Sequence, residues 1–275
     1  MAETGSERIA AAFAAARDQG RAALMPYMVG GYPDQETADA VAEAYVDAGA
    51  DLIELGVPFS DPLADGPVIH AAATAALDAG ATLDAVLGSC RSIADRAPVL
   101  LMVYANMVLA RGVEEFASAA AEAGAAGAIV PDLSHEESPP VRAAIEAEGL
   151  ALVPLVAPTT PPERRRLICA TADGFVYIVS LVGVTGERGE LPAELSKLVD
   201  AVRGEATVPA AVGFGIGTPE QAERVGEIAD GVIIGSRLVR AVGEAGGPDE
   251  AARAARTFIA DCLEAMGRES SRGVR

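Results

Sequence analysis

The chain has 275 residues, a length that suits one large domain or two small ones. Hydrophobic residues make up 51% of it and charged residues 22%, a composition that excludes a disordered chain. Asp and Glu number 40 against 21 Lys and Arg, so the formal net charge is −19 at pH 7. This charge disfavours binding to nucleic acids and to anionic membranes, because both attract basic patches.

Residues suited to metal binding are few and scattered. The only histidines are His70 and His135, and Cys90, Cys169 and Cys262 are far apart in the sequence. We therefore expect neither a metal site nor a disulfide framework, and free thiols fit a reducing, cytoplasmic location. The N-terminus lacks the basic start and apolar run of a signal peptide, and no apolar stretch reaches the length of a membrane span.

Short apolar segments alternate with longer Ala-rich segments along the chain. The short segments are rich in Val, Ile and Leu almost throughout, which is typical of strands buried on both faces of a parallel sheet. We expect strands at residues 23–29, 51–55, 99–104, 126–130, 150–156, 174–179, 208–213 and 231–235. The longer segments have helical spacing and predict helices at residues 6–18, 35–48, 67–78, 113–123, 136–148, 192–203, 218–228 and 248–266.

This alternation predicts an α/β fold, in which residues 1–275 form a single (β/α)8 TIM barrel with an extra N-terminal helix at 6–18. Eight strand–helix units in about 250 residues match the usual size of such a barrel. An open, doubly wound sheet is the alternative. A weak repeat of the helix-to-strand junction, at 48–56, 123–131 and 227–235, favours the barrel. The polar tail, residues 267–275, is expected to fray.

The segment from Glu54 to Pro67 follows the second predicted strand, at the end of the barrel where active sites lie. Side chains alternate along a strand, and a carboxylate facing the apolar helical layer would be costly. Glu54 is therefore expected to point into the barrel mouth, where desolvation raises its pKa towards the range of a general acid or base. A structural ion pair with an arginine is the alternative. Asp65, just before Gly66, is first interpreted as the N-cap of the next helix.

Two glycine turns follow the last two predicted strands. Gly213 to Gly217 has the pattern GxGxG, which differs from the GxGxxG fingerprint of dinucleotide-binding folds. Gly235 and Ser236 form the second turn. Glycines let backbone N–H groups approach an anion closely, and barrels of this class commonly bind phosphate at these two loops. The turns therefore predict a phosphate site, with plain tight turns as the alternative.

A long segment at residues 180–190 contains three glycines and has no periodicity. This composition is typical of a mobile lid, and a disordered surface loop is the alternative. The single lysine, Lys197, falls inside a predicted helix, which disfavours Schiff-base chemistry. The residues that remain favour acid–base chemistry on a phosphorylated small molecule, without a metal or organic cofactor.

Five segments resemble the signature of the tryptophan synthase alpha chain family and occur in the same order along the chain. They are residues 54–67, 102–106, 131–133, 183–186 and 213–216. The first covers the whole loop after the second predicted strand, which makes it far more specific than a lone glycine motif. The resemblance implies a (β/α)8 barrel that cleaves indole-3-glycerol phosphate to indole and D-glyceraldehyde 3-phosphate in a retro-aldol reaction.

The resemblance also assigns roles to individual residues. Glu54 matches the general acid/base, and Asp65 matches a second catalytic carboxylate beside the indole N–H, which reverses its interpretation as a cap. Tyr177 matches a tyrosine near the catalytic site, and Thr185 matches a threonine of the lid. Phosphate contacts match Gly186, Gly215, Gly235 and Ser236, and the indole pocket matches Tyr27, Met102, Tyr104, Ile129 and Phe214.

A partner is implied as well, the tryptophan synthase beta chain, in an αββα tetramer that passes indole between its subunits. Asn106 and Asp132 match positions that face this partner, and pyridoxal phosphate is expected in the beta chain, with no cofactor in this one. Two segments depart from the family pattern. Leu181-Val182 replaces an Arg-Ser pair of some members, which bears on lid contacts. Ser134-His135 replaces a proline-containing stretch on the partner side, which bears on partner affinity.

Three alternatives stay open at the level of sequence. The first is a stand-alone indole-3-glycerol-phosphate lyase. The second is another phosphate-binding barrel, such as an isomerase of an amino-sugar or carboxamide phosphate. The third is a non-catalytic barrel that only activates a partner subunit, and the presence of both Glu54 and Asp65 argues against it.

Overall fold

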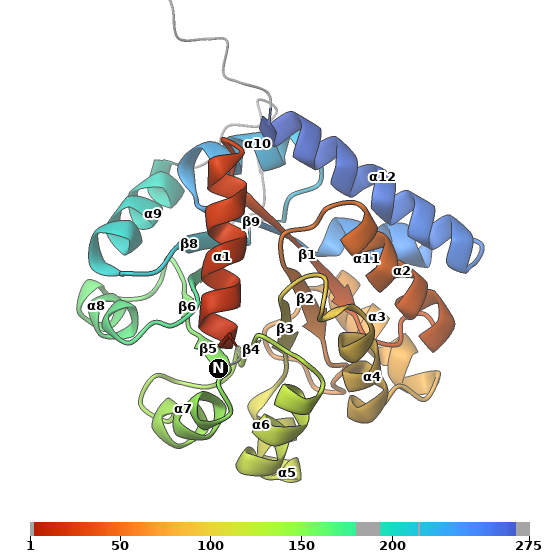
Figure 1. Cartoon of the computed structure of the whole chain (residues 1–275), viewed down its shortest axis with the longest axis horizontal. Coiled ribbons are helices and arrows are strands. Elements are labelled where there is room, and N and C mark those ends of the chain that lie inside the picture. The colour runs from red at the N-terminus through yellow and green to blue at the C-terminus, as the bar shows by residue number, and fades with distance from the viewer. Residues whose placement is uncertain (1–2, 180–192, 214, 268–275) are drawn as a thin grey trace, which may run out of the picture.

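A ring of parallel strands forms the centre of the molecule, and helices surround it (Figure 1). The computed structural model describes residues 3–179, 193–213 and 215–267. The strands are β1 Ala23–Val29, β2 Ile53–Gly56, β3 Val99–Met102, β4 Gly127–Ile129, β5 Ala151–Val153, β6 Leu155–Val156, β7 Val176–Val179, β8 Ala210–Gly213 and β9 Gly231–Ile234.

The ring closes through Pro154. The strand order is β5-β4-β3-β2-β1-β9-β8-β7-β6, so its two ends are strands that follow one another directly in the chain. Proline has no N–H to donate, which interrupts the segment predicted as one strand at 150–156. The Pro154 carbonyl still accepts a hydrogen bond from the backbone N–H of Tyr177, at 3.0 Å. The predicted (β/α)8 barrel is therefore confirmed, and the open doubly wound sheet is excluded.

Helix α1, Gly5–Asp18, closes the N-terminal end of the barrel, and it confirms the predicted extra helix (Figure 1). The side chains of Ile9, Phe13 and Ala16 are buried against interior residues of the barrel such as Met25 and Leu100. Apolar side chains of α1 therefore fill the barrel interior at this end, and active sites of such barrels lie at the opposite end, where the strands finish.

The remaining helices form the outer layer. They are α2 Gln35–Asp47, α3 Pro67–Asp78, α4 Leu83–Ile93, α5 Ala105–Arg111, α6 Val113–Glu122, α7 Ser138–Ala147, α8 Pro162–Ala170, α9 Ala193–Glu205, α10 Pro219–Ile228, α11 Ser236–Gly243 and α12 Pro248–Gly267. Helices α4, α5, α8 and α11 fall outside the predicted helical segments. Helix α7 begins two residues later than predicted, with prolines at its first positions, where a missing N–H is tolerated. Over the described ranges, no helix has the length and apolarity that crossing a membrane requires.

Alternation along β2 separates an outer core from an inner one. Ile53 and Leu55 pack against the helical layer, whereas Leu52 packs inside the barrel. Glu54 shares the inward face with Leu52, as predicted. The parallel register places Glu54 beside Tyr27 of β1. Side chains from neighbouring strands are thereby brought to one level at the barrel mouth.

Candidate active site

A cavity of about 160 Å³ opens at the C-terminal ends of the strands. Its walls come from β1, β2, β3, β6, β7, β8 and β9, from α3, and from the segments that follow β2, β4, β8 and β9. Most of the described residues that the sequence singled out for catalysis or binding meet here. They are Tyr27, Glu54, Asp65, Met102, Tyr177, Gly215, Gly235 and Ser236.

Glu54 lies at the bottom of this cavity and is fully buried. Neither carboxyl oxygen has a hydrogen-bond partner among the described residues, so the alternative of a structural ion pair finds no support there. Burial, together with the negative charge of Asp65, raises the pKa of Glu54 from 4.5 to about 8. The group therefore holds a proton at neutral pH and can donate it to a bound molecule.

Asp65 reaches the same cavity from the loop after β2. The N-cap of α3 is Gly66 and not Asp65, so the first interpretation of Asp65 as a cap is wrong. Burial raises the pKa of Asp65, while a hydrogen bond from Tyr104 and the nearby His70 oppose that change. Two carboxyl groups in different environments can take different protonation roles in one reaction.

Tyr104 holds the loop that carries Asp65. Its hydroxyl accepts a hydrogen bond from the Ala64 N–H at 3.1 Å, and its ring stacks on Phe59 with 5.1 Å between centroids. Tyr104 and Ile129, both predicted for the indole pocket, do not line the cavity. Tyr104 supports its loop, and Ile129 is buried inside the barrel below it.

Two tyrosines lean over glycines on neighbouring strands. A Cβ on Gly56 would overlap the Tyr27 hydroxyl, and a Cβ on Gly213 would lie 2.7 Å from the Tyr177 hydroxyl. Burial, with the charges of Glu54 and Asp65, raises the pKa of both phenols well above its ordinary value. Both phenols therefore stay protonated. The sequence analysis assigned no role to Gly56. A glycine at a strand end, beside a tyrosine that faces inward from the neighbouring strand, could have indicated one.

The two glycine turns differ in how their helices begin. At α10, the Thr218 side chain accepts from the Gln221 N–H, and the Gln221 side chain accepts from the Gly217 N–H at 2.7 Å. At α11, the N-cap is Gly235, which has no side chain to cap the first N–H groups of the helix. Gly235 and Ser236 both line the cavity, so this helix begins at the cavity. An anion is the natural partner for such N–H groups.

The predicted partner-facing residues meet at the start of α5. Asp132 Oδ1 accepts a hydrogen bond from the Ala105 N–H at 2.8 Å, and both Asp132 and Asn106 are exposed. Thr185, Gly186 and Phe214, and the departure at 181–182, lie outside the described residues. Lys197 is exposed on α9. Within the described part of the chain, no three His, Cys, Asp or Glu side chains are grouped to hold a metal ion.

The fold and the cavity together define a (β/α)8-barrel protein with a pair of carboxyl groups at its mouth and an uncapped helix N-terminus beside them. Comparison with known proteins narrows this class. The family model for the tryptophan synthase alpha chain matches residues 13–267. The chain belongs to the tryptophan synthase alpha chain family, a family of lyases in tryptophan biosynthesis.

Individual relatives agree over nearly the whole length. The tryptophan synthase alpha chain of Synechocystis sp. is 46% identical over 261 residues, which cover 94% of this chain and 98% of the relative. The tryptophan synthase alpha chain of Geobacter sulfurreducens is 42% identical over 262 residues, which cover 94% of this chain and 99% of that relative. The solved structure of the subunit from Legionella pneumophila str. Paris superposes with a TM-score of 0.87 at 35% identity, over 96% of this chain and 99% of that one.

Proposed function

We propose that the chain cleaves indole-3-glycerol phosphate to indole and D-glyceraldehyde 3-phosphate, as the alpha subunit of tryptophan synthase. The observation that carries the proposal is Glu54, a fully buried carboxyl group without a described partner, sharing its cavity with Asp65. An unpartnered buried carboxyl is costly to the fold, so its retention in an open cavity suits a group that handles protons.

In the first step, Glu54 donates its proton to C3 of the indole ring. Protonation at C3 removes the aromaticity of the five-membered ring and leaves positive charge at the ring nitrogen. The Asp65 carboxylate, on the same cavity, accepts a hydrogen bond from the ring N–H and stabilises that charge. The pKa of about 8 keeps Glu54 protonated at neutral pH, ready for this step.

In the second step, Glu54 is a carboxylate and accepts the proton of the adjacent glycerol hydroxyl. The carbon–carbon bond to C3 breaks, its electron pair restores the aromatic indole, and the hydroxyl carbon becomes the aldehyde of glyceraldehyde 3-phosphate. The proton taken up equals the proton given, so Glu54 returns to its starting state. One buried carboxyl group can thus serve as acid and then as base.

The walls of the cavity suit the two ends of this substrate. Ile69, Met102 and Ile233 supply apolar surface for the indole ring. The turn at Gly235 and Ser236, with the uncapped N-terminus of α11, supplies backbone donors for the phosphate. Backbone donors act locally, which explains how a chain of charge −19 would attract an anion.

The proposal includes a beta-chain partner on the face that carries the cavity. Asn106 and Asp132 are exposed there, and so are two large apolar side chains, Leu63 at 88% in the loop after β2 and Leu109 at 63% on α5. Burial of these two apolar side chains against a partner would favour association. Thr185 would belong to the lid, and pyridoxal phosphate would belong to the partner. Three buried free thiols suit a cytoplasmic location.

The test is an assay of indole release from indole-3-glycerol phosphate, with and without beta chain, for the native chain and for Glu54→Gln. We expect cleavage that the beta chain stimulates and that the variant loses. Near-native turnover by the variant would overturn the proposal. Cleavage without any stimulation would instead select a stand-alone lyase, and stimulation of the partner without cleavage would select a non-catalytic subunit.

A further inference from the structure

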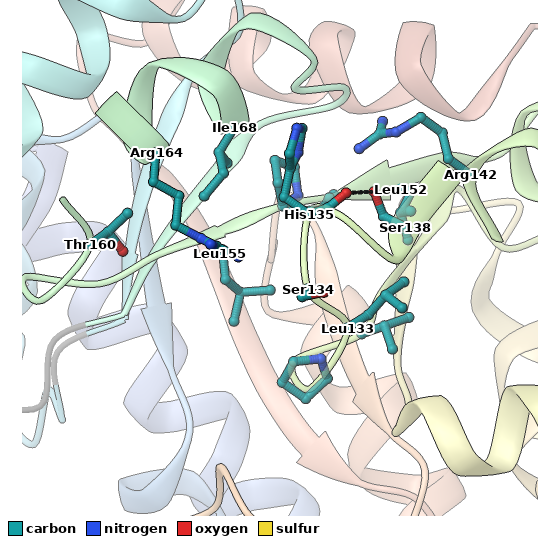
Figure 2. A pocket seen from close by; sticks show the side chains of 14 residues that line it. Leu133, Ser134, His135, Ser138, Arg142, Leu152, Leu155, Thr160, Arg164 and Ile168 are labelled. Carbon is teal, nitrogen blue, oxygen red and sulfur yellow. Dashed lines mark hydrogen bonds between the residues drawn. The ribbon is translucent and has the colours of Figure 1, made fainter. Parts of the chain in front are cut away.

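A second cavity lies beside the catalytic one, between the start of α7 and the start of α8 (Figure 2). Its volume is about 160 Å³, and residues 130–138, 152–155 and 160–168 supply most of its walls. Pro131 and Leu155 line both cavities, so the two share a wall. None of the roles proposed above for the reaction uses the second cavity.

The two cavities are lined by different kinds of ionisable side chain. Among the described residues, the catalytic cavity is lined by the carboxyl groups of Glu54 and Asp65 and by no basic side chain. The second is lined by Arg142, Arg164 and His135, and no carboxyl group is among its fourteen lining residues. In a chain with almost twice as many acidic as basic residues, a cavity lined only by basic ones points to an anionic ligand.

Arg142 is the basic group with spare donors. Its side chain is only 17% exposed, and its ion pair with Glu146 is loose, with 3.6 Å between Nη1 and Oε1. The described residues include no hydrogen-bond acceptor for its guanidinium. By contrast, Arg165 of α8 forms two hydrogen bonds to Glu205, at 2.8 and 2.9 Å. Figure 2 shows the Arg142 guanidinium extending over the cavity towards the His135 ring.

The other polar side chains that line the cavity already have hydrogen-bond partners within the protein. Arg164 already donates to Glu136, at 2.5 Å. The Ser138 hydroxyl donates to the His135 carbonyl at 2.9 Å, which fixes the turn that presents the imidazole (Figure 2). Thr160 accepts from the Ala157 N–H, and the Ser134 hydroxyl donates to Glu137 at 2.8 Å. Arg142 and His135 are therefore the pair left to bind a ligand.

The rest of the wall is apolar. Leu133, Leu152, Leu155 and Ile168 face the cavity from four separate segments. A wholly apolar cavity of about 150 Å³ is large enough for one benzene ring, so the volume here suffices for a body of that size. The space therefore fits a compact apolar body, with Arg142 and His135 available to bind a charged group.

We propose that this cavity binds a small carboxylate with an apolar body of about one ring, held by Arg142 and His135. A guanidinium matches a carboxylate in a two-hydrogen-bond geometry, and partial burial strengthens the pair. The carboxylate would give Arg142 the acceptor that Glu146 supplies only at 3.6 Å. This site is separate from the catalytic one and does not rest on the proposed reaction.

Benzoate is the probe, titrated into the full-length chain and followed by amide chemical shifts. We expect saturable shifts that map to α7 and α8, and at least about ten-fold weaker binding of the neutral analogue benzyl alcohol. Arg142→Met keeps most of the apolar volume and removes the guanidinium, so it should weaken benzoate about ten-fold and leave benzyl alcohol unchanged. Equal benzoate affinity of Arg142→Met and the native chain would overturn the proposal, as would shifts that map elsewhere.

Three further variants keep the test decisive. Arg142→Lys retains the charge but loses the planar fork, so it should bind benzoate with intermediate affinity even if Arg142→Met folds poorly. Arg256→Met removes an exposed arginine of α12 that pairs with Asp47, and should leave benzoate binding unchanged. Glu54→Gln should leave it unchanged too, and a changed benzoate affinity in this variant, in either direction, would assign the ligand to the catalytic cavity and overturn the proposal.

Discussion

The Asp65 carboxylate shares a cavity with the buried Glu54 carboxyl, and its negative charge raises the pKa of Glu54 beyond the effect of burial alone. One strand and the loop that follows it supply both groups. The strand holds Glu54 at a fixed depth in the barrel, while the loop brings Asp65 over it from above. The pair therefore depends on the loop conformation, which Tyr104 supports through Ala64.

Glu54 should make the chain less stable as the pH rises. Its pKa is about 8 in the folded chain and near 4.5 when unfolded, so the folded chain binds the extra proton between these values. The free energy of unfolding should fall across this window and level off above it, by an amount on the order of a few kcal/mol. Glu54→Gln lacks this dependence. Urea unfolding of both proteins at several pH values measures the difference, in which the other carboxyl groups cancel. A constant difference across the window would contradict the raised pKa.

The pH dependence of the cleavage rate should also report the pKa of Glu54. If protonated Glu54 is the acid, kcat/KM falls as the pH rises through about 8. Asp65→Asn removes the second cause of the raised pKa and leaves burial in place, so this fall should move to lower pH. The variant should also lose about a hundred-fold or more in kcat, since the charge at the ring nitrogen is no longer stabilised. If the pH–rate profile of the variant overlays the native one, Asp65 does not influence the pKa of Glu54, and the prediction is contradicted.

The barrel was predictable because its strands are buried on both faces and therefore read as unbroken apolar runs. Pro154 escaped this pattern, since a proline inside an apolar run changes hydrogen bonding and not hydropathy. The short helices α5, α8 and α11 were missed for a related reason. Each follows a strand closely and is too short to establish a helical period, with seven to nine residues.

The candidate site was predictable where side chains sit on strands. Strand alternation and the cost of burying a carboxylate against the helical layer placed Glu54 in the barrel, whereas Asp65 lies in a loop, where local spacing favoured a cap. The structure gives the cap to Gly66. The cavity that contains Arg142 had no sequence signal, because its walls come from segments on different strands and helices that only the closed ring brings together.

Gly213→Ala tests whether the position of Tyr177 matters for catalysis. The new Cβ would lie 2.7 Å from the Tyr177 hydroxyl, which forces the ring away from the cavity floor. We expect a drop in kcat of about ten-fold or more, with a smaller loss of stability. Gly204→Ala on α9 is the matched control, because a Cβ there meets no atom within 4 Å. This control should keep full activity and gain about 0.5–1 kcal/mol. Equal activity of both variants would show that the position of Tyr177 does not matter for catalysis.

Gly235→Asp tests the phosphate site at the start of α11. A Cβ on Gly235 has room, since its contacts with Tyr27 and Ile69 would be 3.4 Å or longer. The added carboxylate would occupy the N–H groups that we assign to the phosphate and repel the dianion. KM for the substrate should rise roughly ten- to hundred-fold, with the free energy of unfolding changed by about 1 kcal/mol or less. Gly204→Asp, which adds the same charge on the remote α9, should leave KM unchanged. Ser236→Ala removes one hydroxyl and should raise KM by a few-fold only. An unchanged KM in Gly235→Asp would assign the phosphate to the other glycine turn, at Gly215, which lines the same cavity and has a φ of +64°.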